Sequence, residues 1–195
     1  EPINKVRQVM GVDRTAQIHA MAKDRECEFD YHVNMYFPSG GSGYKELTDF
    51  YSEGLYETRK LRGFTLDYML RSRIQQKACP VPDFLKIDVQ GGELDVIRGA
   101  PLSLTTINAI YMEVSVLPYN QEGPLFHEVI NTMQALGWYL VDIETSMKVE
   151  NYTVQFDCFF VRKGSLYWNR ALENIKKVPA NMMQIMQNHQ QKPVD

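Results

Sequence analysis

The chain has 195 residues, of which 44% are hydrophobic and 23% are charged, and its net charge is −3. This length suits one globular domain and is short for two. The weak negative charge argues against a nucleic-acid surface, and no apolar run approaches the roughly 18 residues that a membrane helix needs. We therefore expect a small-molecule substrate, no nucleic-acid partner and no membrane; the sequence does not indicate an oligomeric state.

The first part of the chain predicts a short helix over residues 4–10 and a buried strand over residues 15–22, in which His19 is a hydrogen-bonded core residue. Residues 26–33 alternate between apolar and polar side chains, which is typical of a half-exposed antiparallel strand. The three cysteines, Cys27, Cys79 and Cys158, are far apart and lack metal-ligand spacing. They indicate a reducing, cytoplasmic setting rather than a disulfide framework.

Residues 38–44, PSGGSGY, form a glycine-rich loop. The loop lacks both the Lys-Ser/Thr ending of a phosphate-binding P-loop and the G-x-G-x-x-G spacing of a dinucleotide-binding turn. We interpret it as flexible, or alternatively as part of the wall of a substrate pocket. The charged and aromatic residues 45–62 are interpreted as a surface excursion, or alternatively as a mobile lid.

Residues 65–71 predict the start of a helix that Thr65 caps, and prolines stiffen the chain before the next strand. That strand, residues 84–89, places Lys86 and Asp88 on one face because strand side chains alternate in direction. Gln90, Gly91 and Gly92 then turn the chain into a short helix that stops at Gly99. A strand ending in a carboxylate, a glycine turn and a helix form the corner at which open parallel sheets bind ligands.

Residues 107–116 predict a second strand, which contains Glu113. If it lies parallel to the strand at 84–89, Asp88 and Glu113 emerge at the same edge of the sheet and border one cleft. Residues 124–136 predict an amphipathic helix on which His127 and Glu128 point apart by about 100 degrees, so they are expected to be solvated.

Residues 138–143 and 153–161 predict a final antiparallel pair of strands. Asp157 interrupts the apolar pattern of the last strand and should contact a polar group, because burial without a partner is costly. A helix follows at residues 165–177. We expect one α/β domain over residues 1–178, and a tail or short helix over residues 179–195 that packs on it or serves as an apolar docking strip.

The segments GFTLDYML, FLKIDVQGGELDVIRGA and AIYMEV closely resemble the FkbM-type methyltransferases, which depend on S-adenosylmethionine. The resemblance implies a Rossmann-like, class I methyltransferase sheet, mostly parallel, with the antiparallel pair at one edge. It also implies that Glu1, followed by Pro2, binds the ribose hydroxyls of the cofactor. The first strand and its glycine-rich cofactor loop are then expected upstream of residue 1.

This resemblance implies an O-methyltransferase that acts on a hydroxyl of a carbohydrate or a secondary metabolite. Methyl transfer needs a positioned acceptor and a group that takes its proton. Asp88 is the candidate for that group, Lys86 is expected to keep it ionised or to bind the substrate, and Glu113 and Glu93 are candidates for substrate contacts. A salt bridge without a catalytic role is the alternative for Lys86 and Asp88, and helix-start electrostatics is the alternative for Glu93.

Two other functions stay open. The chain fits a non-catalytic, degenerate methyltransferase-like interaction domain, which an upstream G-x-G motif would argue against. Asp88, Glu113 and Asp157 also suggest metal-assisted hydrolysis, although their spacing is not diagnostic of a metal site, so no metal is predicted.

Overall fold

The computed structural model describes residues 21–75 and 81–176 of the chain. The predicted helix at 4–10, His19 and the tail from residue 179 lie outside the described residues. The strands are β1 (Met21–Ala22), β2 (Cys27–Asn34), β3 (Tyr56–Phe64), β4 (Phe84–Ile87), β5 (Ala109–Ser115), β6 (Trp138–Val149) and β7 (Tyr152–Arg162). The helices are α2 (Leu66–Gln75), α3 (Glu93–Arg98), α4 (Phe126–Ala135) and α5 (Leu166–Ile175), and short 3-10 turns lie at Pro38–Gly40, Asp49–Tyr51 and Ser103–Thr105.

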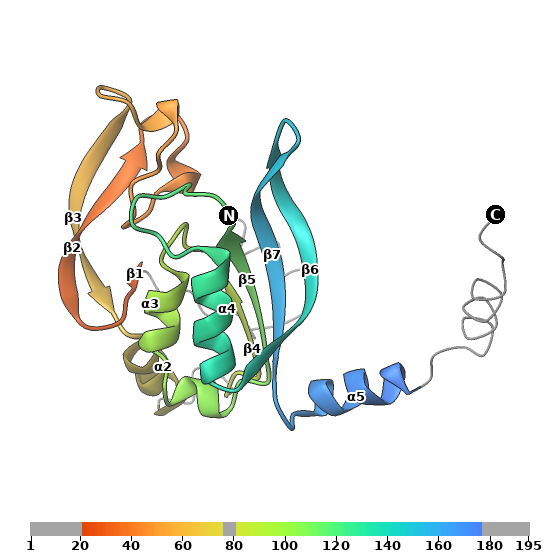
Figure 1. The fold of residues 1–195 in the computed structure, drawn as a ribbon. Helices are drawn as coiled ribbons and strands as arrows, with labels where there is room; N and C mark the ends of the chain where they lie inside the picture. Colours follow the sequence, from red (N-terminus) through yellow and green to blue (C-terminus); the bar gives the residue numbers. More distant parts are fainter. Residues whose placement is uncertain (1–20, 76–80, 177–195) are drawn as a thin grey trace, which may run out of the picture.

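The strands form two sheets rather than the single sheet expected from the sequence. One sheet has the order β1-β3-β2 and the other has the order β4-β5-β7-β6 (Figure 1). Only β1 with β3 and β4 with β5 run parallel, so the expectation of a mostly parallel sheet is wrong for the described strands. The reason is the path of the chain: β7 follows β6 after a two-residue turn and inserts beside β5, which makes both of its pairings antiparallel.

The first sheet confirms the alternating strand predicted over residues 26–33, which is β2. Its partner β3 overlaps the end of residues 45–62, which we interpreted from the sequence as a surface excursion or, alternatively, as a mobile lid. The many charged residues of β3 obscure the alternating pattern by which a strand is recognised in a sequence. In the structure these side chains pair across the sheet with charged side chains of β2. The ion pairs Asp30–Lys60 and Glu26–Arg62 are both exposed.

The second sheet confirms two predictions: the strand within residues 84–89 and the antiparallel pair at the edge. The parallel pairing of β4 with β5 meets the condition set for Asp88 and Glu113 to share one edge. Ile87 of β4 lies in register with Met112 of β5. The helix predicted over residues 124–136 is α4, and the predicted stop of α3 at Gly99 is confirmed.

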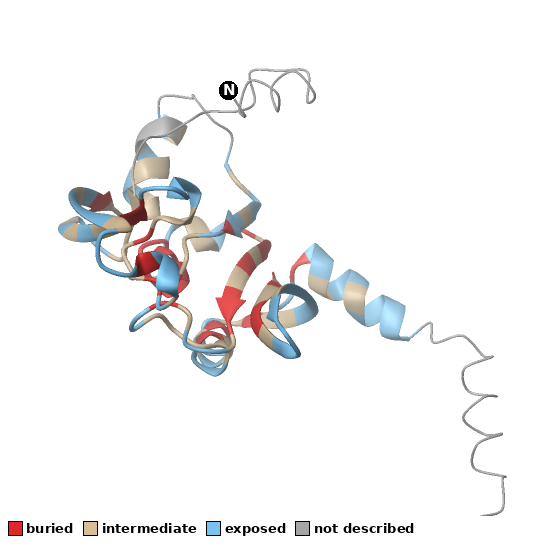
Figure 2. Cartoon of the chain, turned by 90° about the horizontal axis from the view of Figure 1, so that it is seen from above, coloured by how far each residue is buried: buried red, intermediate tan, exposed pale blue. Residues whose placement is uncertain are grey.

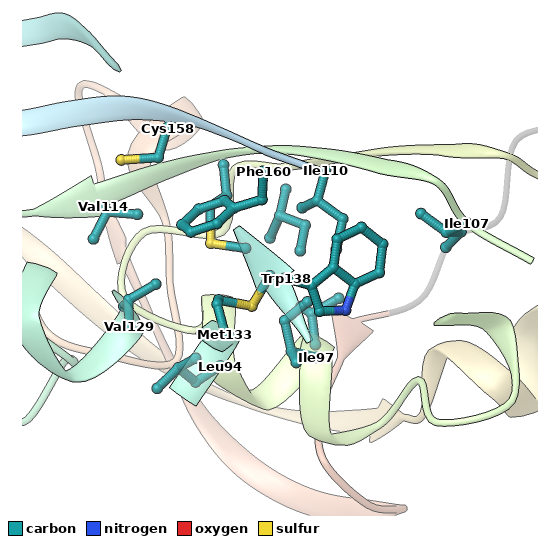
Figure 3. Packing of buried hydrophobic residues seen from close by; sticks show 13 residues of the cluster. Leu94, Ile97, Ile107, Ile110, Val114, Val129, Met133, Trp138, Cys158 and Phe160 are labelled. Carbon is teal, nitrogen blue, oxygen red and sulfur yellow. The ribbon is translucent and has the colours of Figure 1, made fainter. Parts of the chain in front are cut away.

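Helices α3 and α4 cover one face of the second sheet (Figure 1). Their buried side chains, Leu94 and Ile97 of α3 and Val129 and Met133 of α4, pack in one cluster with residues of β4 to β7. Figure 3 shows this cluster around Met133, and Figure 2 shows that buried residues concentrate in the centre of the molecule. Burial of this apolar surface holds the second sheet in place and so fixes the ends of β4 and β5.

Side-chain caps lie at the start of two helices, and the cap at Thr65 was predicted from the sequence. The backbone N–H of Tyr68 donates to Thr65 Oγ1 over 3.1 Å at the start of α2, and Ser165 Oγ accepts from Trp168 N in the same way at α5. Such caps satisfy donors that have no partner within the helix. No helix in the described part of the chain is long and apolar enough to cross a membrane.

Candidate functional site

The turn between β4 and α3 runs from Asp88 to Gly92 and reverses the chain at the rim of the second sheet. Gln90 has φ 53° and Gly91 has φ 97°, so both residues lie in the left-handed region. Side chains from two directions hold this backbone. The Ser42 hydroxyl donates to the Gln90 carbonyl over 2.7 Å, and the Glu93 carboxylate accepts from the Gly91 N–H over 3.1 Å.

Asp88 follows the last residue of β4, and its side chain is 48% exposed. Lys86 Nζ donates to one of its carboxylate oxygens over 3.0 Å, and Gln90 Nε2 donates to the other over 3.1 Å. Partial burial opposes ionisation of Asp88, but the two hydrogen bonds outweigh burial and lower its pKa below the usual value. The bond to Asp88 raises the pKa of Lys86, so the pair is ionised at neutral pH.

Glu113 lies on the neighbouring strand, one residue beyond the Met112 position that pairs with Ile87. Gln90 Nε2 donates to its carboxylate over 2.8 Å, and Gln155 Nε2 of β7 donates to the same oxygen over 3.0 Å. Burial raises the pKa of Glu113 against the effect of the Gln90 bond, and the negative charge of Asp88 raises it further. The predicted meeting of the two carboxylates at one edge is confirmed, with Gln90 joining them.

Glu93 is buried, with 4% of its surface exposed. Its carboxylate faces the backbone of the turn, so it does not have the open position that a substrate contact requires. Burial raises its pKa to about 7, against the lowering effect of backbone hydrogen bonds from Glu93, Gly91 and Val89. Glu93 therefore supports the turn that carries Gln90.

A cavity of about 540 Å³ lies beside the same turn, between α3, α4 and the loop that follows β5. Gly91, Asp95 and Asn120 are among its lining residues, whereas Asp88 and Glu113 are not. The two carboxylates therefore share a hydrogen-bonding amide at the rim, but this cavity is not the cleft that they were expected to border.

Comparison with protein families places this geometry in context. A family model described as "Methyltransferase FkbM domain" matches residues 3–138, which is more than half of the chain and includes β4, the turn, α3 and β5. The chain belongs to the FkbM methyltransferase family. None of the curated proteins and none of the solved structures matches it.

Sequence reasoning missed Gln90 as a member of this candidate site. The signal was present, since a residue other than glycine stands directly before two glycines after a strand-end carboxylate. Its role depends on the positive φ, which aims a long amide side chain back over the strand ends. Glu1, the predicted ribose contact, lies outside the described residues.

Asp157 of β7 lies in register opposite Glu113 of β5. Burial is the main cause that raises the pKa of Tyr111, and Asp157 raises it further. The two acids thus lie on adjacent strands. Within residues 21–75 and 81–176, no group of three or more His, Cys, Asp or Glu side chains is arranged to hold a metal ion.

The remaining sequence candidates have structural contacts. Glu128 at the start of α4 accepts the backbone N–H of Leu125 over 2.8 Å, which is a helix cap. The glycine-rich loop at 38–44 contains Ser42, which holds the turn, and Ser39 and Gly40, which line a second cavity of about 300 Å³. The loop therefore belongs to the surroundings of the site.

Proposed function

We propose that this FkbM family member is an S-adenosylmethionine-dependent O-methyltransferase that acts on a hydroxyl of a carbohydrate or a secondary metabolite. The observation that carries the proposal is the pair of carboxylates, Asp88 and Glu113, joined by the Gln90 amide at the rim of the β4–β5 pair. The rim where parallel strands end is the general position of ligand sites in open α/β sheets, and the Rossmann-like class is the fold that we propose for the complete domain.

The residues at this rim fit the proposed cofactor. The carboxylates of Asp88 and Glu113 make the site electronegative, which favours a ligand that carries a positive sulfonium. S-adenosylmethionine, when bound, supplies the methyl group. Glu1 remains our candidate for the contact to the ribose hydroxyls.

The acidity of each carboxylate suggests a different role in the reaction. Asp88 has a lowered pKa, so it is ionised throughout the neutral range and is suited to accept a hydrogen bond from the acceptor hydroxyl and to orient it. Glu113 has a raised pKa, and a base is most effective when its pKa approaches the working pH. We therefore assign the proton-accepting role to Glu113, the orienting role to Asp88, and the role of keeping Asp88 ionised to Lys86.

The test is the substitution Asp88→Asn, which keeps the shape of the side chain and removes its charge. Turnover with S-adenosylmethionine and a panel of hydroxylated acceptors should fall by about 10²-fold, the cost of a reacting group that is no longer correctly positioned. The affinity for S-adenosylmethionine, measured by calorimetry, should change much less. Asp83→Asn is the matched control, because Asp83 is an exposed aspartate just before the same strand.

Unchanged turnover in Asp88→Asn would remove Asp88 from the mechanism. Failure to bind S-adenosylmethionine by a protein that carries the expected upstream glycine-rich loop would favour the alternative of a non-catalytic interaction domain.

We also propose that residues 1–178 act as one methyltransferase unit, with residues 179–195 as its tail.

Cys27 and Cys158 are free thiols. The cytoplasmic setting predicted from the cysteine pattern remains a prediction.

A further inference from the structure

The second cavity, of about 300 Å³, has a wall of aromatic rings and one carboxylate. It lies between the connection from β2 to β3 and the loop that follows β5. The rings belong to Phe37, Phe50, Tyr51 and Tyr119. Among the described residues that line the cavity, Glu46 is the one that carries a charge. A mostly aromatic wall with a few polar groups is typical of ligand pockets.

Hydrogen bonds within the protein fix the positions of these rings. Asn34 at the end of β2 joins the two turns that carry them: its Oδ1 accepts the backbone N–H of Phe37 over 2.9 Å, and its Nδ2 donates to the carbonyl of Phe50. The hydroxyl of Tyr51 donates to the Gly40 carbonyl over 3.1 Å. The rings of Phe37 and Phe50 meet edge to face, with their centroids 5.6 Å apart. Rings held in this way lower the ordering cost of binding a ligand.

Two of the rings are open to a ligand. Phe37 is 61% exposed and Phe50 is 57% exposed, whereas Tyr51 is 4% exposed. A ligand that covers the two phenylalanine rings would remove their apolar surface from water, which favours binding.

Glu46 places a negative charge in the same wall. It is 9% exposed, and the hydroxyl of Thr48 donates to its carboxylate. In the described part of the chain, none of the ion pairs includes Glu46. Its neighbour Lys45 lies over the ring of Tyr56, with Nζ 4.5 Å from the ring centroid. The charge of Glu46 therefore acts on the cavity without an ion-pair partner among these residues.

The charge of Glu46 reaches two of the rings. Burial is the main cause that raises the pKa of Tyr119, and the negative charge of Glu46 raises it further. Burial also raises the pKa of Tyr51, again with a contribution from Glu46. A positive group in the cavity would be attracted by the same charge, which is screened less in a partly buried site than in open water.

These features favour an organic ammonium ion over other ligands. Ring faces attract ammonium groups, and several rings around one cation form the cage that recognises quaternary ammonium ligands. Calcium and magnesium ions need about six or more oxygen ligands, which ring faces do not supply. A neutral apolar molecule would gain from contact with the rings but not from the charge of Glu46.

We propose that this cavity is a binding site for an organic ammonium group, which contacts the aromatic lining and whose charge Glu46 balances. The group contacts the exposed faces of Phe37 and Phe50, and Glu46 acts on it through its charge rather than by direct contact, so the burial of Glu46 does not prevent binding. The proposal is independent of the proposed methyltransferase function, since Asp88 and Glu113 do not line this cavity.

The test is a saturation-transfer NMR titration of the full chain with two probes of the same shape. Choline carries a trimethylammonium group, and 3,3-dimethylbutan-1-ol has an uncharged carbon in place of the nitrogen. Choline should bind with a saturable signal. The uncharged analogue should bind at least about tenfold more weakly, because it lacks the attraction to the rings and to Glu46.

Glu46→Gln removes the charge and keeps both the shape of the side chain and an acceptor for the Thr48 hydroxyl. It should weaken choline binding at least about tenfold and leave the binding of the uncharged analogue unchanged. Glu53→Gln is the matched control, since Glu53 is exposed and lies outside the lining of this cavity.

Phe50→Leu removes one exposed ring and should weaken choline binding by about two- to fivefold, the contribution of one exposed cation–π contact. Phe84→Leu is the matched control, since Phe84 is 47% exposed on β4 and lies outside the lining.

Absence of choline binding overturns the proposal. Equal binding of choline and the uncharged analogue also overturns it, because the site is then an apolar pocket without selectivity for charge. If Glu46→Gln fails to fold, the change at the exposed Phe50 still decides the question, since choline binding that persists unchanged in Phe50→Leu refutes this cavity as the site.

Discussion

Replacing Glu93 by Gln should remove a pH dependence of stability that the native protein has. Burial raises the pKa of Glu93 to about 7 in the folded state, compared with its ordinary value of 4.5. The folded protein therefore binds this proton more tightly than the unfolded chain does. The resulting stabilisation is fully present below pH 4.5 and is lost as the pH rises through about 7.

The size of the effect follows from these two pKa values. The slope of the unfolding free energy with pH depends on the difference in bound protons between the unfolded and folded states. Integrating this slope from pH 5 to pH 8 gives a loss of about 2.5 kcal/mol of unfolding free energy from this one group. In Glu93→Gln the side chain cannot ionise, so its unfolding free energy should rise relative to the native protein by about that amount over the same interval. A constant offset from altered hydrogen bonds to the turn does not affect the comparison.

The assay is urea denaturation at several pH values, followed by tryptophan fluorescence. Trp138 is suited to this readout because it is buried in the core cluster, with 2% of its surface exposed. Glu53→Gln at an exposed position controls for the loss of one negative charge. A difference between Glu93→Gln and the native protein that stays constant from pH 5 to pH 8 would refute the reasoning.

Two further substitutions test the contacts around the turn. Gln90→Leu removes the amide that lowers the pKa of both Asp88 and Glu113, so the acidic limb of the turnover–pH profile should move to higher pH; an unmoved limb would contradict the bridging role. Asp95→Ala leaves Lys23 without its buried ion-pair partner, and thermal unfolding should show a loss of about 3–5 kcal/mol. A loss below about 1 kcal/mol, the value for an exposed pair, would show that this contact is not structural.

The corner from β4 to α3 could be predicted because its determinants are local. The alternation of Lys86 and Asp88, the two glycines of the turn and the helix stop at Gly99 all act within a few residues of one another. The parallel pairing of β4 with β5 was only a condition at the sequence level, and the structure meets it. Together with that pairing, these local signals bring Asp88 and Glu113 to one edge.

The contacts that depend on remote segments could not be predicted in the same way. Strand β3 was missed because a segment rich in charged residues is not typical of a strand. The residues of β2 that pair with these charges are distant in the sequence. Gln90 was missed because its role depends on a positive φ at that position. The division into two sheets follows from the insertion of β7 beside β5, which no single segment specifies.

The hydroxyl of Ser42 has a practical consequence for protein engineering. Ser42 is buried, and it reaches the carbonyl of Gln90 from a segment 48 positions earlier in the chain. The segment from β4 to α3 therefore depends on a contact from outside itself and is not expected to keep its conformation when it is transferred alone to another protein. A shortened version of the protein that keeps the corner but trims the β2–β3 connection would lose the external support that sets the orientation of its bridging amide.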